Sequence, residues 1–452
     1  MAAGTIGRVV LAGFVLALGG ADAAAQPAPK ITVDVRNVLV PVVVTDAKGR
    51  HVTGLKRSDF KVFEDGVPQE IAGFSTTVDS SSPETGALVG PKPGPRQGGA
   101  SDTVRHTYLV CLDTLHSSFA SFTRVRDALL KSLRQERGSD SQYALMALGR
   151  ELNVVKDSTR DAASIEAAIG SKEFTKVIQT TEATSTGVAI QEFTALMRNY
   201  CGMCACGSNG GSDQPGCSGV KGRVRAFLSS YEERTYILNH NFLVTLYDLV
   251  RATASIPAAR TILFVSDGFN RFPGRELYAI VQGFSPSDHS FEFPSRDTEP
   301  ELENILKLAT RYDVKFYTLD SRGVYSAVFS AGGTFDASTP YSTTTQLDAR
   351  NRPSEATTTT ESLDLQGASV ARENTDAMAQ LARDTGGLFF QNSNDLAKSI
   401  TRVLTDTREY YVLAYVSKNE ALDGLYRKIK VEVKGGDKFR VNAKAGYWAA
   451  EK

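Results

Sequence analysis

Two aspartates, each at the end of a short apolar run, are the residues whose types and spacing could do chemistry. Asp113 ends a run that starts at Tyr108 and is followed by the hydroxyl of Ser117, and Asp267 ends a run that starts at Thr261. Carboxylate and hydroxyl oxygens are the ligands that hard divalent cations such as Mg²⁺ prefer. If the two aspartates meet, they predict a cation site. The alternative is that each carboxylate caps a neighbouring helix and accepts backbone N–H groups.

The elements around the aspartates decide whether they meet. Apolar runs without polar alternation are typical of parallel strands that are buried on both faces. Between residues 106 and 405, such runs alternate with segments of helical spacing, for example Phe122, Val125, Leu129 and Leu133. This alternation predicts an α/β fold with a doubly wound, mostly parallel sheet. Ligands bind at the carboxyl ends of strands in such sheets, so we expect both aspartates at that edge.

The rest of the chain divides around this α/β domain. Short β-branched runs and Gly-containing turns predict β-strands before and after it, which form an accessory unit. Segments rich in Ser, Thr, Pro and Gly predict a flexible linker and a loop without its own core. The predicted boundaries are a β unit at 31–75, a linker at 79–101, the α/β domain at 106–405 with an insertion at 201–217 and a Thr/Ser-rich loop at 326–362, and C-terminal strands at 410–448.

The first 25 residues have the plan of a secretory signal peptide. Arg8 precedes an apolar stretch from Val9 to Leu18, and Ala23, Ala24 and Ala25 offer a cleavage site. A membrane anchor is the alternative, but the stretch is short for a span of about 20 residues. We expect a secreted or periplasmic protein without an integral membrane span after cleavage. Lys plus Arg and Asp plus Glu each number 51, so the chain has no excess of positive charge of the kind that predicts nucleic-acid binding.

The chain has five cysteines, and four of them crowd into the insertion. Cys111 lies inside an apolar run and is expected to fill space in the core. The other four could form a zinc site or two disulfides. Export favours disulfides, because exported proteins fold in oxidising compartments. Four cysteines allow three pairings, and the sequence does not select one of them. The four are Cys201, Cys204, Cys206 and Cys217.

Several phrases in this order resemble the von Willebrand factor type A (VWFA, or VWA) family in its bacterial form. The resemblance covers residues 31–75 and 106–448 and implies a Rossmann-like VWA fold. The phrases are Val44-Thr45-Asp46, Gly54-Leu55, Glu64-Asp65-Gly66, Leu112-Asp113, Ser266-Asp267-Gly268, Tyr317-Thr318-Leu319-Asp320, Thr385-Gly386-Gly387 and Tyr411-Val412-Leu413-Ala414-Tyr415.

The resemblance also implies a metal-ion-dependent adhesion site (MIDAS). In the family, an Asp-x-Ser-x-Ser loop, a Thr and a second Asp hold Mg²⁺, which keeps an open position for an acidic group of a partner. Asp113 and Ser117 match the first loop and Asp267 matches the third. Leu115 stands where the family has the middle Ser and supplies no oxygen.

Two residues of the candidate site have competing interpretations. The Thr of the second loop is Thr245 or, alternatively, Thr186. His116 could supply a nitrogen ligand or respond to pH, but with no second His flanking it we expect a solvent-facing loop residue.

The predicted function is an exported protein-binding or adhesion module with a protein partner and a degenerate Mg²⁺ site. We do not expect an enzyme, because the sequence has no Gly-x-Ser-x-Gly elbow, no His-Glu-x-x-His and no phosphate-binding glycine loop before a helix. Two alternatives stay open. One is an envelope scaffold with a vestigial metal site, and the other is a hydrolase on the same fold.

Overall fold

The computed structural model describes residues 37–77, 106–135, 141–179, 183–204, 216–256, 259–284, 291, 296–324 and 373–451. All of them belong to one compact unit, Asn37–Lys452. The predicted signal peptide, the linker at 79–101 and the Thr/Ser-rich loop at 326–362 lie outside the described residues.

The centre of this unit is a six-stranded sheet with the order β10-β9-β8-β5-β6-β7. All neighbouring strands are parallel except β6 and β7, which pair antiparallel as a hairpin. The predicted α/β fold with a mostly parallel sheet is therefore confirmed. The strands are β5 (His106–Asp113), β6 (Ser141–Leu148), β7 (Leu152–Thr159), β8 (Ala259–Ser266), β9 (Val314–Asp320) and β10 (Phe389–Phe390).

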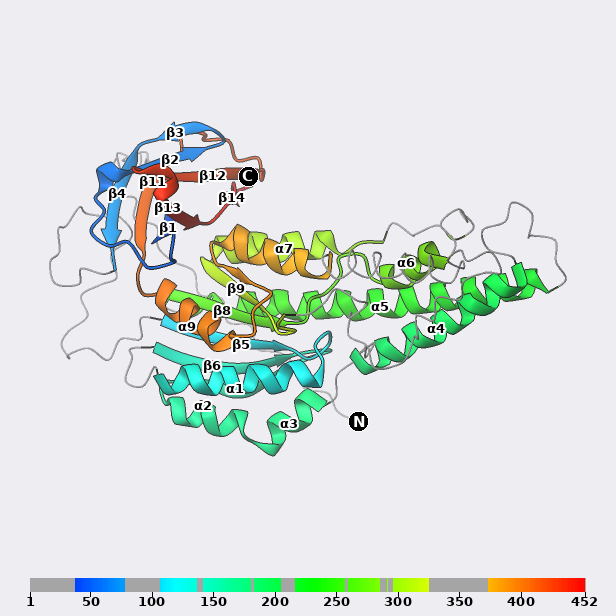
Figure 1. The fold of residues 1–452 in the computed structure, drawn as a ribbon. Helices are drawn as coiled ribbons and strands as arrows, with labels where there is room; N and C mark the ends of the chain where they lie inside the picture. Colours follow the sequence, from blue (N-terminus) through cyan, green and yellow to red (C-terminus); the bar gives the residue numbers. More distant parts are fainter. Residues whose placement is uncertain are drawn as a thin grey trace, which may run out of the picture. The chain divides into compact units, whose positions relative to one another are not determined.

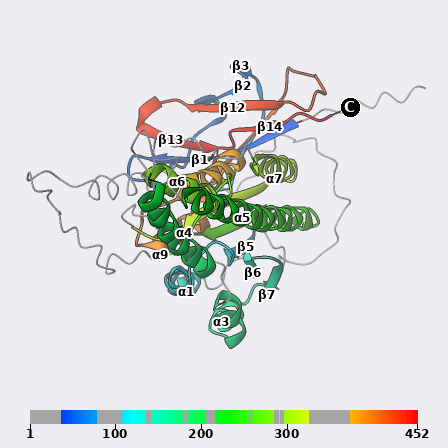
Figure 2. The ribbon, with the colours of Figure 1, turned by 90° about the vertical axis from the view of Figure 1, so that its right-hand side faces the viewer.

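Helices cover both faces of this sheet (Figures 1 and 2). On one face, α1 and α9 pack on alternate strand residues such as Tyr108 and Leu263. On the other face, α5 and α7 pack on the intervening residues, such as Leu109 and Ile262. The helices are α1 (Phe119–Gln135), α2 (Ala162–Ile169), α3 (Lys172–Gln179), α4 (Ala183–Cys204), α5 (Cys217–Thr253), α6 (Arg275–Phe284), α7 (Glu299–Arg311) and α9 (Leu396–Asp406), and residues 373–385 are also helical.

Helices α4 and α5 lie side by side and share a core of their own with α6 (Figure 1). A disulfide between Cys204 and Cys217 joins the end of α4 to the start of α5. Cys201 is disulfide-bonded as well, and Cys206 lies outside the described residues. The preference for a disulfide over zinc is thus confirmed for Cys204 and Cys217. Cys111 is a buried free thiol in β5, as expected.

The strands from the two ends of the chain combine into two antiparallel four-stranded sheets, with the orders β13-β1-β11-β4 and β14-β12-β2-β3. Their shared core contains Val40, Val42, Phe60 and Leu413. The predicted accessory unit from both terminal segments is therefore confirmed. Its strands are β1 (Asn37–Asp46), β2 (Phe60–Glu64), β3 (Val67–Gln69), β4 (Ile71–Thr76), β11 (Tyr411–Val416), β12 (Tyr426–Val433), β13 (Phe439–Ala443) and β14 (Gly446–Trp448).

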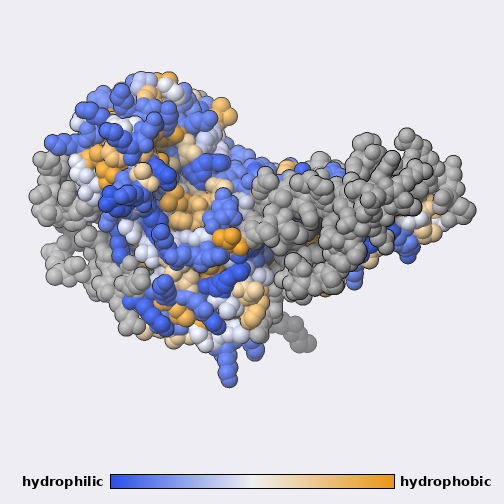
Figure 3. Space-filling view, viewed as in Figure 1, coloured by the Kyte–Doolittle hydropathy of each residue, from blue (hydrophilic) through white to orange (hydrophobic). Residues whose placement is uncertain are grey.

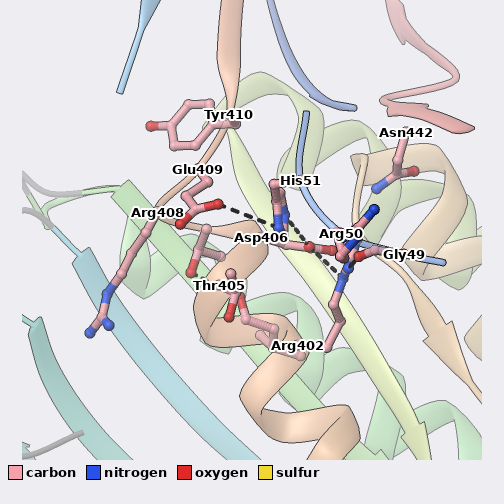
Figure 4. Close-up of polar contacts among 12 residues, drawn as sticks. Gly49, Arg50, His51, Arg402, Thr405, Asp406, Arg408, Glu409, Tyr410 and Asn442 are labelled. Carbon is pink, nitrogen blue, oxygen red and sulfur yellow. Dashed lines mark hydrogen bonds and ion pairs between the residues drawn. The ribbon is translucent and has the colours of Figure 1, made fainter. Parts of the chain in front are cut away.

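A cluster of charged residues connects the accessory unit to α9 (Figure 4). The Asp406 carboxylate is fully buried, with His51 Nε2 at 2.8 Å and Arg402 Nε at 2.6 Å. Arg402 also donates to the carbonyl oxygen of Gly49, and His51 Nδ1 lies 3.5 Å from Glu409. The cluster therefore connects the loop after β1 to the last turn of α9.

The face of the molecule seen in Figure 3 is mostly hydrophilic over the described residues, with apolar side chains scattered among the polar ones. Within the described residues, no helix has the length and hydropathy needed to cross a membrane.

Candidate functional site

The carboxyl edge of the central sheet brings the two predicted aspartates together. β5 and β8 are parallel neighbours, so Asp113, the last residue of β5, and Asp267, which follows β8, lie at adjacent strand ends. Ser266 Oγ donates to Asp113 Oδ2 at 2.6 Å, and the backbone N–H of Ser118 donates to Asp267 Oδ2 at 2.9 Å. The two loops are therefore joined through both carboxylates.

Asp113 is fully buried, and both of its carboxylate oxygens have protein donors. Oδ1 accepts the backbone N–H groups of Leu115 at 2.9 Å and His116 at 3.0 Å. Oδ2 accepts the hydroxyl of Ser266 and lies 2.9 Å from His116 Nδ1. Asp113 thus fixes the conformation of the loop that follows it.

His116 lies against this carboxylate and not in solvent. Its side chain is only 16% exposed. The ring packs edge-on against Phe242, with 4.8 Å between ring centroids, and it also contacts Phe269. The prediction of a solvent-facing loop histidine was wrong, because the apolar face of α5 and the loop after β8 enclose the ring.

The hydrogen bonds of His116 define its protonation state. Nε2 lies 2.7 Å from Asn239 Oδ1, and Asn239 Nδ2 donates to the carbonyl oxygen of Asn270 at 2.9 Å. That second bond orients the amide, so Nε2 faces an acceptor while Nδ1 faces the Asp113 carboxylate. Both ring nitrogens must then carry hydrogen, which makes the ring an imidazolium. Burial lowers the pKa of His116, but the charge of Asp113 and the two hydrogen bonds outweigh it, and the net pKa is raised.

Asp267 is held mainly by hydroxyl groups. Oδ1 accepts from Ser321 Oγ at 2.6 Å, and Oδ2 accepts from Ser121 Oγ at 2.9 Å in addition to the N–H of Ser118. The backbone N–H of Asp267 donates to Ser117 Oγ at 3.0 Å. Burial raises the pKa of Asp267, and the hydrogen bonds from Ser321, Ser118 and Ser121 oppose that rise.

The two candidate threonines lie in different places. Thr245 lies in the middle of α5, where its hydroxyl donates to the carbonyl oxygen of Asn241 at 2.8 Å. Thr245 is not among the residues that line the cavity beside Asp267. Thr186, at the start of α4, lines a cavity next to His116 and Asp267. Of the two, only Thr186 is near the site.

The described arrangement does not fit a Mg²⁺ ion of the MIDAS type. Mg²⁺ requires about six oxygens in near-octahedral geometry. Leu115 supplies none, the His116 ring lies against Asp113, and the oxygens of Asp267 accept hydrogen bonds from hydroxyl and N–H groups. Among the described residues, no group of three or more His, Cys, Asp or Glu side chains converges as a metal site. The carboxylates instead accept the N–H groups of adjacent loops, as the capping alternative predicts.

We therefore expect titration calorimetry of the purified protein with Mg²⁺ or Mn²⁺ to give no saturable heat. The imidazolium already neutralises Asp113, so a cation would have to displace it. Saturable heat in the wild type would instead indicate a metal site of the MIDAS type. In that case Asp113→Ala should abolish the heat, and the distant variant Asp248→Ala should leave it unchanged.

A partly open cavity of about 90 Å³ lies beside His116. Loops at the sheet edge, the helices α4, α5 and α6, and the helix at 373–385 contribute to its wall. Its lining includes Thr186, Tyr231, Asn239, Asn270, Glu276 and Asn374. Tyr231 donates its hydroxyl to Glu276 Oε1 at 2.5 Å. Burial is the main cause that raises the pKa of Glu276.

Sequence reasoning missed most of this lining. Asn239 had one recognisable signal, because it is a polar residue on the buried face of α5 between apolar positions. Glu276, Asn270 and Asn374 belong to no motif, and only the fold brings them together.

No family model and no curated protein match the sequence. Solved structures that match this chain include proteins described as having a MIDAS motif or a vWF domain. An aerotolerance-related membrane protein from Bacteroides fragilis is 11% identical over 66% of this chain and 98% of its own, with a TM-score of 0.29. Proximal thread matrix protein 1 from the mussel byssus, with a zinc-occupied MIDAS motif, is 9% identical over 70% of this chain and 48% of its own, with a TM-score of 0.28. The vWF domain of the type V pili tip protein Mfa5 from Porphyromonas gingivalis is 10% identical over 71% of this chain and 99% of its own, with a TM-score of 0.22.

The strand order β10-β9-β8-β5-β6-β7, with one antiparallel edge strand and helices on both faces, gives the α/β domain a VWA-like fold. An accessory β unit built from both terminal segments flanks it.

Proposed function

We propose that this chain is an exported protein-binding module that contacts a protein partner at the carboxyl edge of its central sheet. The observation that carries the proposal is the cavity beside His116 and Asp267, which lies where open α/β sheets bind ligands. Hydrogen bonds fix the loops around it, so the surface is preorganised, and preorganisation lowers the entropic cost of binding. The export part of the proposal is based on the signal peptide that we predict for the first 25 residues, and the disulfide between Cys204 and Cys217 supports an oxidising compartment.

The proposal assigns no catalytic role to His116 or Asp267. A general base needs a free lone pair within reach of a proton. Both ring nitrogens of His116 donate hydrogen bonds, and the hydroxyls of Ser121 and Ser321 donate to Asp267. The Mg²⁺ that the VWA resemblance implies is also left out of the proposal, because its ligand positions are taken by protein groups. Binding is therefore expected to be insensitive to chelators.

Affinity capture with matched variants tests this proposal. The immobilised protein would be exposed to the exported and surface proteins of the producing cells, with and without a chelator. Thr235→Trp places a large side chain at the cavity wall, whereas Ile237→Trp changes an exposed position of the same helix that does not line the cavity. We expect the wild type and Ile237→Trp to retain the same partner, and Thr235→Trp to retain at least about tenfold less.

Two outcomes would count against the proposal. If Thr235→Trp retains the partner as well as the wild type, while both variants melt like the wild type, the contact lies elsewhere and the scaffold alternative is favoured. If no protein is retained above a blank surface, the chain is not a binding module under these conditions. Turnover in an esterase and peptidase screen that Thr235→Trp abolishes would favour the hydrolase alternative.

A further inference from the structure

Two buried polar atoms that belong to residues of the cavity wall have no hydrogen-bond partner. They are Asn270 Nδ2, which is a donor, and Asn374 Oδ1, which is an acceptor. The two residues are 7% and 8% exposed, respectively. Buried polar groups in folded proteins nearly always have partners, so such a pair indicates a group that binds there. A donor and an acceptor that line one small cavity require a ligand that offers both.

Nearby contacts fix the Asn270 side chain and the Asn374 backbone. Asn270 Oδ1 accepts the backbone N–H of Phe272 at 2.8 Å, which leaves Nδ2 to face another direction. Gly268 has a left-handed φ of +99°, and a Cβ there would lie 2.7 Å from the Asn374 carbonyl oxygen. The loop after β8 can therefore approach Asn374 closely only because residue 268 is glycine. Both residues thus lie in the cavity wall.

The charges at the cavity select among ligand classes. Asp113 lies against His116, while Asp267 and Glu276 add two more carboxylates to the cavity wall. The charge of Arg322 acts on Asp267, and that of His116 acts on Glu276. A carboxylate ligand would be repelled by these carboxylates, and the imidazolium has no free N–H to bind it. An ammonium group would be attracted, but it has no acceptor for Asn270 Nδ2. A primary amide has a carbonyl oxygen for Asn270 and two N–H groups, for Asn374 and for Glu276.

We propose that the cavity beside His116 is a subsite for a primary carboxamide, supplied by an asparagine or glutamine side chain of the protein partner. At about 90 Å³ the cavity suits the end of a side chain, since sites for drug-sized ligands span about 300–1,000 Å³. The inference depends on the proposed function only for the source of the amide. The carboxamide recognition itself is a property of this chain.

Ligand-observed NMR titration with three probes of similar size tests this subsite without the partner. The probes are propionamide, propionate and n-propylammonium. We expect saturable binding of propionamide to the wild type, with propionate and n-propylammonium at least fivefold weaker. The variant Asn270→Asp keeps the acceptor for the Phe272 N–H and removes the donor, so it should bind propionamide at least tenfold more weakly and gain affinity for n-propylammonium. The matched variant Asn374→Asp keeps an acceptor and should retain propionamide binding.

Several outcomes would overturn the inference. Preference of the wild type for n-propylammonium would indicate a basic side chain of the partner. Preference for propionate would indicate an acidic one. No saturable binding of any probe would mean that water satisfies Asn270 and Asn374. Each of these results is independent of partner capture, so failure of the subsite and failure of the proposed function are distinguishable.

Discussion

Replacing His116 with alanine is expected to lower the free energy of unfolding by about 3–5 kcal/mol, the range seen when one partner of a buried ion pair is removed. The Asp113 carboxylate would keep its backbone donors but lose the imidazolium that lies 2.9 Å away. Asn239 would lose the donor to its carbonyl oxygen. The ring contacts with Phe242 and Phe269 would also disappear. Urea denaturation followed by circular dichroism measures the change.

His240→Ala is the matched control for this prediction. His240 also forms an ion pair, with its Nδ1 2.7 Å from Glu301 Oε1, but its side chain is 42% exposed. Exposed pairs contribute at most about 1 kcal/mol, so the control should be close to the wild type. Equal losses for His116→Ala and His240→Ala would contradict the buried ion pair.

The pH dependence of the same comparison gives a second, independent readout. The folded-state pKa of His116 is raised above its ordinary value of 6.5. Its contribution to stability is therefore fully present below about pH 6.5 and is lost as the pH rises through the raised folded-state value. The stability gap between the wild type and His116→Ala should shrink between pH 6 and an alkaline pH above that value. A constant gap would show that folding does not shift the pKa of His116, and a gap that grows with pH would show that His116 is neutral in the folded protein.

Arg402→Met is expected to destabilise the protein by about 3 kcal/mol, because it leaves a buried carboxylate with one partner fewer. The Asp406 side chain is fully buried, and its neighbours Arg402 and His51 are 23% and 8% exposed. Burial raises the pKa of Asp406, and the nearby charges of Arg402 and His51 oppose that rise. Methionine keeps much of the apolar stem of Arg402, so the loss reports on the charge and on the bond to Gly49.

Arg251→Met is the control for Arg402→Met. Arg251 and Asp248 both lie on α5, 3.0 Å apart, and their side chains are 65% and 52% exposed. Removing the Arg251 charge should therefore lower the free energy of unfolding by less than about 1 kcal/mol. A double-mutant cycle with Asp406→Asn isolates the coupling. Hydrogen exchange should also quicken at residues 49–51, where the accessory unit meets α9. Unchanged exchange there and a loss below about 1 kcal/mol would contradict the connecting role of the cluster.

The fold was predictable because its signals are local. Apolar runs such as 108–112 and 261–265 indicated buried parallel strands, and parallel neighbours place their carboxyl ends at one edge. That reasoning located Asp113 and Asp267 correctly. Helix α6 was not predicted, although seven of its ten residues are buried.

The site was less predictable because its contacts are distant along the chain. His116 and Asn239 are separated by 123 residues, and no spacing rule connects them. The choice between Thr186 and Thr245 depended on where α4 and α5 begin, which is the least reliable part of a sequence-based assignment. Leu115 did indicate a departure from the metal site, but not that an imidazolium would lie against Asp113.

The accessory unit has a consequence for how the protein is made. Thr77 and Tyr410 are hydrogen-bonded although 333 residues separate them, so the α/β domain is nested within the β unit. During synthesis the first four strands leave the ribosome long before β11 to β14 exist. A chain that stops after α9 would keep β1 without either neighbour, and unpaired strands invite aggregation. Only a chain that has been synthesised through β14 can therefore complete this unit, and a chain that terminates early leaves β1 unpaired.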